Sequence, residues 1–291
     1  MEVTVLEQVS LKDYNTLGLN SVAALMAIPH SEVGLVELVS ENIHKRIIVL
    51  GKGSNILLSQ DYYDENTIFV DLSLLSNIYY QDGFISVQAG ATLSKLVWFA
   101  VEKGIVGFEF LEDIPGTVGG AIIMNAGTYR DYISNLILSV RYYDYETNQV
   151  IERKVEENDF ARRYSFWSKT KCIIMSASFK VSFGDNIESI RKIASIKESR
   201  FLKQPRNYPN AGSVFVRPKK DLLDKVVWEL IDAVGLRGFR IGGAEFSKKH
   251  PGFILNLGDA TFDDVNSLIT TAQTRVSSEF GICLKMEWKI I

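Results

Sequence analysis

Two glycine-rich segments contain the residue types that could hold a phosphate-bearing ligand. The first, Gly51-Lys52-Gly53-Ser54-Asn55, follows the short apolar run at residues 46–50. Glycine lets backbone N–H groups come close to a phosphate, and Ser and Asn side chains can add donors. Ile56 stands where the dinucleotide-binding fingerprint needs a third glycine. Taken alone, this segment is therefore equally consistent with a structural turn.

The second segment strengthens the case for a ligand. It reads Ile114-Pro115-Gly116-Thr117-Val118-Gly119-Gly120-Ala121 and is followed by Met124-Asn125-Ala126-Gly127. Two such loops could hold one extended diphosphate ligand from two sides, whereas a structural reading needs two unrelated close backbone crossings. The glycine content of residues 107–127 predicts a tightly held loop with no regular element.

Three polar residues stand in apolar or glycine-rich surroundings, namely Arg163, Ser213 and Glu287. Each alone is most simply a solvated side chain, a cap or a member of a surface ion pair. The three histidines form no Ser-His-Asp order and no metal-ligand spacing, which argues against a histidine-based hydrolase.

Composition narrows the class of protein. A length of 291 residues favours two or three modest domains, and a net charge of −3 provides no basic field for nucleic acid. Cys172 and Cys283 match no metal or disulfide pattern and are expected to be buried in a reducing compartment. No signal peptide or membrane span is indicated, so the sequence predicts a soluble, cytoplasmic protein.

Hydrophobic periodicity predicts mixed elements with many hairpins, which indicates an α+β fold. The expected strands and hairpins are a strand at 46–50, a strand at 66–72, a hairpin at 78–90 around Asp82-Gly83, a hairpin from 137–144 and 149–155, a strand at 172–182 and a strand-like tail at 283–290. The expected helices are 92–103 before Gly104, 186–203 linking two domains, 222–234 before Gly235, and one from a capping signal at Thr261–Asp264 to about Phe280.

In order and spacing, these segments resemble the UDP-N-acetylenolpyruvoylglucosamine reductase (MurB) family almost from end to end. The motifs that carry the resemblance are Asn15-Thr16-Leu17-Gly18, Leu50 to Asn55, Gly107-Phe108-Glu109, Ile114 to Asn125, Arg163 with Ser165, Ala211-Gly212-Ser213-Val214-Phe215, Gly235-Leu236-Arg237-Gly238, Ile241-Gly242-Gly243-Ala244, Ser247-Lys248-Lys249-His250, Asn256 and Leu284-Lys285-Met286-Glu287. The length resembles the shorter type II subtype of the family.

The resemblance implies an α+β architecture with an FAD-binding half of the PCMH (vanillyl-alcohol-oxidase) type. Its two subdomains would span residues 1–74 and 75–195, and a smaller substrate-binding domain would span 196–282. The last strand, 283–291, is expected to return to the site. The protein is expected to be a monomer or weak oligomer with no nucleic-acid or membrane partner.

The implied activity is that of a UDP-N-acetylmuramate dehydrogenase of peptidoglycan precursor synthesis. With non-covalent FAD and NADPH as hydride donor, it would reduce the enolpyruvyl group of UDP-N-acetylglucosamine enolpyruvate. By resemblance, Arg163 stabilises the developing enolate, Ser213 donates a proton, and Glu287 acts with Arg163; the three are expected to converge over the flavin ring. The implied FAD contacts are Gly51 to Asn55, Ile114 to Gly120 and Asn125 to Gly127; the implied substrate contacts are Arg163, Ser213, Arg217, Ser247, His250 and Asn256.

Three positions depart from the family pattern. Arg162 stands where tyrosine is frequent, Val216-Arg217 where a lysine is common, and Asp113 where glycine is frequent. These departures keep two alternatives open: a catalytically altered paralogue that binds flavin or nucleotide sugar, and another PCMH-type FAD oxidoreductase. The absence of a well-placed histidine for a covalent flavin link argues against the second.

Overall fold

The protein is described by a computed structural model that covers residues 2–128, 131–218 and 225–291. The chain divides into two compact units, each assembled from three stretches of sequence. Unit 1 comprises Met1–Gln8, Ala24–Lys52 and Asp64–Ser199, and unit 2 comprises Val9–Ala23, Gly53–Tyr63 and Arg200–Ile291. The three-part division expected at 74/75 and 195/196 stays a prediction.

A four-stranded sheet has the order β1-β2-β5-β3. Its strands are β1 (Val3–Ser10), β2 (Val22–Pro29), β5 (Tyr62–Asp71) and β3 (Arg46–Leu50). β3 runs parallel to β5 and matches the predicted strand at 46–50. Helix α1 (Glu32–Glu41) begins after Ser31, whose hydroxyl accepts a hydrogen bond from the N–H of Gly34 at 3.0 Å.

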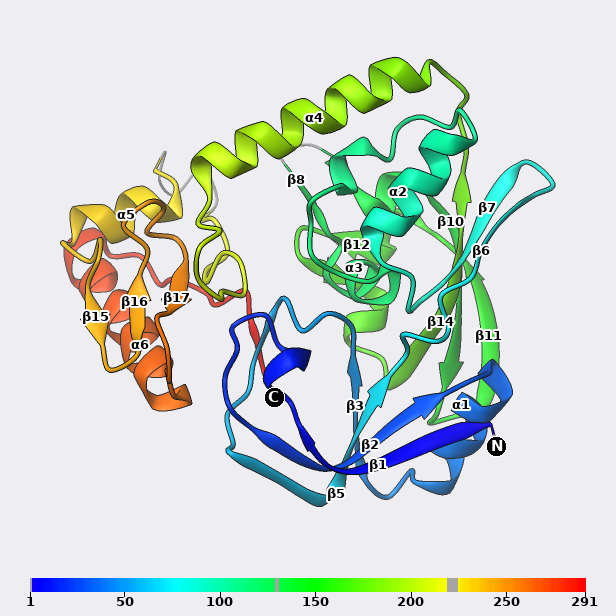
Figure 1. The fold of residues 1–291 in the computed structure, drawn as a ribbon, viewed down its shortest axis with the longest axis horizontal. Helices are drawn as coiled ribbons and strands as arrows, with labels where there is room; N and C mark the ends of the chain where they lie inside the picture. Colours follow the sequence, from blue (N-terminus) through cyan, green and yellow to red (C-terminus); the bar gives the residue numbers. More distant parts are fainter. Residues whose placement is uncertain (1, 129–130, 219–224) are drawn as a thin grey trace. The chain divides into compact units, whose positions relative to one another are not determined.

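A five-stranded sheet forms the centre of unit 1 (Figure 1), with the order β11-β10-β14-β7-β6. Its strands are β6 (Ile78–Gln81), β7 (Phe84–Gln88), β10 (Ile137–Asp144), β11 (Gln149–Lys154) and β14 (Cys172–Lys180). β6 and β7 pair antiparallel, as do β10 and β11, which confirms both predicted hairpins. β14 confirms the predicted strand at 172–182 and pairs antiparallel with β10 and β7. Helix α2 (Leu93–Glu102), capped by Thr92, matches the predicted helix at 92–103 and buries Leu93, Leu96, Val97 and Ala100 in the core of unit 1.

The prediction for residues 107–127 was wrong in one respect. The segment contains a short 3-10 helix, Glu109–Leu111, and a helix of one and a half to two turns, α3 (Val118–Met124). Glycine disfavours helices by up to about 1 kcal/mol per residue, and α3 includes Gly119 and Gly120. Burial of Val118, Ala121 and Ile122 in the core of unit 1 offsets that cost.

Small elements complete the region that follows α3. They are β8 (Gly127–Thr128), β9 (Asp131–Tyr132), β12 (Phe160–Ala161), β13 (Tyr164–Ser165) and the 3-10 helices Ile133–Asn135, Glu157–Asp159 and Phe166–Ser168. β12 and β13 form a two-residue hairpin whose turn is Arg162-Arg163.

Helix α4 (Asn186–Lys203) matches the predicted helix at 186–203. Polar contacts hold it to the segment before α3. Ser189 donates to the Glu109 carboxylate at 2.6 Å, and Lys197 pairs with Glu112 at 2.8 Å. Both carboxyl groups are buried, so α4 is fixed to unit 1 by charge and hydrogen bonding more than by an apolar face.

Unit 2 has its own core, in which α6 (Phe262–Phe280) packs on the three-stranded sheet β15-β16-β17. The other elements are β15 (Arg240–Ile241), β16 (Ala244–Phe246), β17 (Ile254–Asn256), β4 (Ile56–Leu57), β18 (Lys289–Ile290), the 3-10 helix Lys12–Tyr14 and α5 (Val227–Ala233). The capping signal at Thr261 is confirmed by reciprocal bonds with Asp264, both 3.1 Å. The helix expected at 222–234 begins only at Val227, and residues 222–224 lie outside the described ones.

The C-terminal tail is less regular than expected. Of residues 283–290, only β18 forms a strand, parallel to β4, with one isolated bridge at Met286. The expectation of two buried cysteines also fails for Cys283, which is exposed. Cys172 is partly buried, and burial raises the pKa of its thiol to about 11. Among the described residues, no helix has the length and apolar character that a membrane crossing requires.

Candidate active site

The first glycine-rich segment begins where β3 ends. A Cβ atom on Gly51 would lie 2.6 Å from the Oγ1 of Thr117, which is closer than real side chains approach. The start of the first loop and the second loop therefore meet within unit 1, and the contact requires glycine at position 51.

From Gly53 onward this loop belongs to unit 2, where hydrogen bonds and close backbone contacts fix it. Gly53 has a φ of +61°, and a Cβ there would lie 2.0 Å from the carbonyl oxygen of Tyr14. Asn55 donates from Nδ2 to the carbonyl of Glu287 at 3.2 Å, and Lys289 N–H donates to the carbonyl of Asn55 at 3.0 Å. Gly53 is thus a structural glycine, while Asn55 joins the loop to the segment that carries Glu287.

In the second loop, the glycines divide into two kinds. The N–H of Gly119 donates to the Ala89 carbonyl at 2.9 Å, and a Cβ on Gly119 would lie 3.0 Å from that of Ala89. By contrast, a Cβ on Gly116 or Gly120 would meet only ordinary van der Waals contacts, at 3.6 and 3.5 Å. Gly119 therefore packs α3 onto unit 1, whereas the surroundings of Gly116 and Gly120 would admit a Cβ atom.

Arg163 occupies an unusual backbone conformation at the turn between β12 and β13. Its φ of +57° lies in the left-handed region, which a long side chain adopts at a cost of about 1–2 kcal/mol. Its Nη1 donates to the carbonyl of Gly127 at 3.4 Å. Strained non-glycine residues concentrate at functional sites, so the backbone of Arg163 is a structural signal independent of any sequence motif.

The hairpin that carries Arg163 is anchored from two sides. The buried Asp159, just before β12, accepts hydrogen bonds from Nε and Nη2 of Arg153 at 3.2 and 2.8 Å. On the other side, the fully buried Trp167 packs against the rings of Phe160 and Phe166, with centroids 5.5 and 5.6 Å away.

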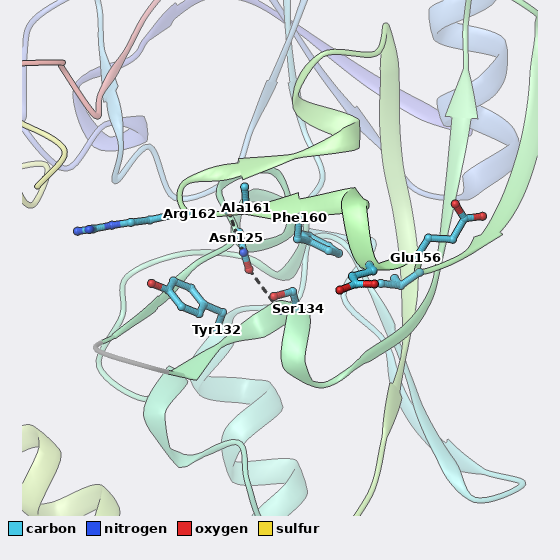
Figure 2. A pocket seen from close by; sticks show the side chains of 9 residues that line it. Asn125, Tyr132, Ser134, Glu156, Phe160, Ala161 and Arg162 are labelled. Atoms are coloured by element: carbon cyan, nitrogen blue, oxygen red, sulfur yellow. Dashed lines mark hydrogen bonds between the residues drawn. The ribbon is translucent and has the colours of Figure 1, made fainter. Parts of the chain in front are cut away.

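A cavity of about 410 Å³ opens beside this hairpin (Figure 2). Polar and charged side chains form much of its wall, and the lining residues are Asn125, Tyr132, Ser134, Val155, Glu156, Glu157, Phe160, Ala161 and Arg162. The side chains of Arg162 and Tyr132 extend toward the same side of it. Arg162, one of the departures from the family pattern, is exposed. It places a second cationic residue beside Arg163 in the turn.

In unit 2, the backbone brings Ser213 and Glu287 onto neighbouring segments. The N–H of Glu287 donates to the carbonyl of Val214 at 2.8 Å, and Phe215 forms an antiparallel bridge with Met286. Ser213 is exposed and Glu287 is partly buried. Glu287 is therefore hydrogen-bonded through its backbone to the residue that follows Ser213, so two of the three expected catalytic residues lie on paired segments.

The expected substrate contacts of unit 2 have differing settings. Ser247 is buried, and its hydroxyl accepts from the N–H groups of Lys249 and His250, both at 3.2 Å. His250 packs on Phe253 with ring centroids 4.8 Å apart, and burial lowers the pKa of its imidazole, which favours the neutral form. Arg217 is exposed.

Asn256 already uses its whole side-chain amide. Nδ2 donates to the carbonyls of Leu17 and Gly18 at 2.9 and 3.2 Å, and Oδ1 accepts from the N–H groups of Gly258 and Ala260 at 2.9 and 3.2 Å. The motif at residues 15–18 is thereby joined to β17. A contact between Asn256 and substrate stays a prediction, as does the convergence of Arg163 with Ser213 and Glu287.

Comparison with known proteins identifies the family. Residues 204–291 match the family model of the UDP-N-acetylenolpyruvoylglucosamine reductase C-terminal domain. A UDP-N-acetylenolpyruvoylglucosamine reductase from Caldanaerobacter subterraneus is 36% identical over 283 residues, covering 97% of this chain and 91% of the relative. The chain belongs to the UDP-N-acetylenolpyruvoylglucosamine reductase family. A relative of the same name from Caldicellulosiruptor bescii is 37% identical and covers 97% of this chain.

The family assignment confirms the resemblance and the α+β fold class. The crystal structure of UDP-N-acetylenolpyruvylglucosamine reductase from Thermus caldophilus matches with a TM-score of 0.82, 30% identity and 99% coverage of both chains. Residues 23–152 match an FAD binding domain, and this range contains both glycine-rich loops. Arg163 lies between the two matched domains, and Ser213 and Glu287 lie in the C-terminal one.

Sequence reasoning missed several residues that shape the site. Asp159 anchors the arginine hairpin through its bonds with Arg153, and Ala89 packs against Gly119 of the second loop. Neither stands out in the sequence, because the partners are distant in sequence or are themselves ordinary polar residues. The departure at Asp113 gave a usable signal: its φ is +68°, the conformation for which glycine is suited.

Proposed function

We propose that this protein is an FAD-dependent reductase that converts UDP-N-acetylglucosamine enolpyruvate into UDP-N-acetylmuramate with NADPH as hydride donor. The observation that carries the proposal is the extent of the family likeness. Relatives with this name match 97% of the chain at 36–37% identity, and both the FAD-binding domain and the family's C-terminal domain are present. The proposal places the enzyme in cytoplasmic peptidoglycan precursor synthesis.

The glycine loops suit an FAD diphosphate. Gly120 is exposed, and Lys52 in the first loop is exposed and positively charged. The N–H groups of Val118 and Gly119 donate to the carbonyls of Ala91 and Ala89, and that of Gly120 donates to the Thr117 hydroxyl. The ligand would therefore approach the exposed side of the loop at Gly120, next to these committed groups. When bound, FAD supplies the hydride relay between the nicotinamide donor and the enolpyruvyl carbon.

Arg163 is proposed to stabilise the negative charge that develops toward the substrate carboxylate. An arginine guanidinium is a planar cation that presents several fixed donors to a carboxylate. Removing one such donor from a dry site typically costs on the order of 3 kcal/mol of barrier, which sets the scale of the expected contribution.

Ser213 is proposed to donate the proton that completes the reduction. An alcohol is a weak acid, so it can act only on a strongly basic, enolate-like carbon at close range. Glu287, on the neighbouring segment, is proposed to act with Arg163 at the same end of the substrate. The backbone hydrogen bond from Glu287 to Val214 holds the segment that carries the Glu287 carboxyl beside the segment that carries the Ser213 hydroxyl.

An assay of NADPH oxidation tests the function against both alternatives. The purified protein should be yellow, release its flavin on denaturation, and oxidise NADPH in proportion to added enolpyruvyl UDP-sugar. If NADPH reduces the flavin but the enolpyruvyl UDP-sugar does not reoxidise it, the protein is a catalytically altered paralogue. Reoxidation by oxygen with no effect of the sugar would indicate another PCMH-type oxidoreductase.

A further inference from the structure

Asn125 ends helix α3 in a conformation that few residues adopt. Its φ and ψ are +43° and +60°, in the left-handed region where asparagine is tolerated better than most side chains. The residue is 3% exposed, so its amide is committed to partners inside unit 1. The family resemblance implies a cofactor contact at Asn125, which stays a prediction.

The side chain of Asn125 reaches the hairpin that carries Arg163. Nδ2 donates to the carbonyl of Ala161 at 2.9 Å, across 36 residues of sequence, and Oδ1 accepts from the N–H of Ser134 at 3.4 Å. Figure 2 shows the amide lying between these two partners. Ala161 pairs with Tyr164 and so borders the turn Arg162-Arg163 directly.

Two further bonds connect the same two segments. The Ser165 hydroxyl donates to the carbonyl of Ile123 at 3.0 Å, and Arg163 Nη1 donates to that of Gly127 at 3.4 Å. The end of the second glycine loop thus meets the hairpin at residues 123, 125 and 127. In two of these bonds the loop contributes only a backbone carbonyl, whereas at the third it contributes the side chain of Asn125.

We propose that Asn125 is a positioning residue for Arg163, which fixes the arginine turn against the end of the flavin-binding loop; this inference rests on the proposed role of Arg163. The turn needs such support because Arg163 has a left-handed φ that its own side chain disfavours. Asparagine meets two demands at position 125: it accepts the left-handed conformation, and it supplies an N–H donor. Glycine meets only the first, and aspartate replaces the donor by an acceptor that faces a carbonyl.

The test compares Asn125→Gly and Asn125→Asp with the control Asn148→Gly in the flavin-loaded enzyme. Asn148 also has a left-handed φ, +54°, but lies in the turn between β10 and β11. We expect both variants at 125 to slow reoxidation of the reduced flavin by the enolpyruvyl UDP-sugar about 10- to 100-fold, since small misplacement of a catalytic group has effects of this size. Flavin reduction by NADPH should change little, and the control should match wild type.

Two more measurements separate positioning from general destabilisation. In an Arg163→Ala background, Asn125→Gly should add almost no further loss, because a residue that acts through Arg163 has nothing left to position. Hydrogen exchange of residues 160–165 in the flavin-loaded protein should accelerate in both variants while exchange in β10 and β14 stays unchanged.

The possible outcomes distinguish this inference from the proposed function. If wild type fails to transfer reducing equivalents to the sugar, the proposed function is wrong, and the exchange experiment alone still tests the link between Asn125 and the hairpin. If wild type is active, equal loss in both half-reactions, full additivity with Arg163→Ala, or unchanged exchange at 160–165 would each overturn the positioning role. Should Asn125→Gly fail to fold, Asn125→Asp, which keeps the residue's size, provides the same three measurements.

Discussion

The segment that carries Arg163 and the segments that carry Ser213 and Glu287 are held in place by different means. Around Arg163, side chains make most of the connections: Asn125 to Ala161, Ser165 to Ile123, and Arg153 to Asp159. Around Ser213 and Glu287, backbone hydrogen bonds join the segments, from Glu287 to Val214, Val216 to Lys285 and Val214 to Gly252, at 2.8–3.0 Å, and the Asn55 side chain adds a bond to the Glu287 carbonyl.

This difference predicts different sensitivities to mutation. A backbone ladder persists when a side chain is replaced, so substitutions at Ser213 should change the chemistry and leave the geometry intact. A hairpin specified by individual side chains can be displaced by replacing any one of them. The arginine region should therefore respond to substitutions at residues that never contact substrate, and the serine region should not.

The largest effect is expected for Ser213→Ala. Loss of a positioned general acid costs about 10²- to 10⁴-fold, and here it should fall on flavin reoxidation by the enolpyruvyl UDP-sugar while flavin reduction by NADPH is preserved. Because Ser213 is exposed, the free energy of unfolding should change by less than about 0.5 kcal/mol. Stopped-flow absorbance of both half-reactions and urea unfolding provide the two readouts. A large loss of stability would contradict the backbone-held character of this segment.

The next effect is expected for Asp159→Asn, in the side-chain-held region. Its carboxylate is buried and accepts bonds from Arg153 and from the N–H of Glu156 at 2.9 Å. Weakening these charge-assisted bonds should lower the free energy of unfolding by about 1–3 kcal/mol and should also slow the sugar-dependent half-reaction, because the hairpin shifts.

Glu156→Gln is the matched control for this experiment. Glu156 pairs with the same Arg153 at 3.1 Å, but its side chain is 71% exposed. Exposed ion pairs contribute little, so the loss of this one should lower the free energy of unfolding by less than about 1 kcal/mol. Equal effects of the two substitutions would show that the arginine hairpin does not depend on the buried carboxylate.

The same difference explains which parts of the fold the sequence could predict. The strand at 46–50, the hairpin around Asp82-Gly83 and the Thr261 capping box depend on local patterns and were confirmed. Helix α3 was missed because local propensity disfavours Gly119 and Gly120, and burial of Val118, Ala121 and Ile122 in the core, which the local sequence does not reveal, offsets that cost. The tail was over-predicted because alternation cannot show which residues find a partner strand.

Site residues follow the same rule. The family resemblance supplied Arg163, Ser213 and Glu287 as candidates, yet nothing in the sequence revealed the left-handed backbone of Arg163 or its support by Asn125. That support joins residues 36 positions apart through one amide and one carbonyl, and a single sequence carries no trace of such a pair. The backbone proximity of Ser213 and Glu287 was equally invisible.

A smaller effect, dependent on pH, is expected at Glu109, which fixes α4 to the segment before the second loop. Burial acts to raise the pKa of this carboxyl, but bonds from Ser189, from the N–H groups of Glu109 and Gly107, and the charge of Lys192 together lower it. A lowered pKa in the folded state stabilises the protein above the ordinary glutamate pKa, and that stabilisation is lost as pH falls through the lowered pKa.

Urea unfolding at several pH values checks this expectation. At about pH 7, Glu109→Gln should be less stable than wild type by about 1–2 kcal/mol, and the gap should narrow toward about pH 4 and below. Exposed Glu157 supplies a control, because Glu157→Gln should leave the pH profile of wild type unchanged. A gap that widens on acidification would give the opposite sign and exclude the assigned cause.

The smallest effect is expected at Asp113, where backbone conformation can be separated from side-chain contacts. With a φ of +68°, alanine at this position is strained and glycine is not. Asp113→Gly should therefore be more stable than Asp113→Ala by about 1 kcal/mol, measured by urea unfolding. At exposed Asp131 in β9, the order should reverse, since glycine weakens a strand. If the alanine variant were the more stable one at both positions, the left-handed φ of Asp113 would not limit which residue this position accepts. The segment before the second loop would then not be held by its backbone conformation.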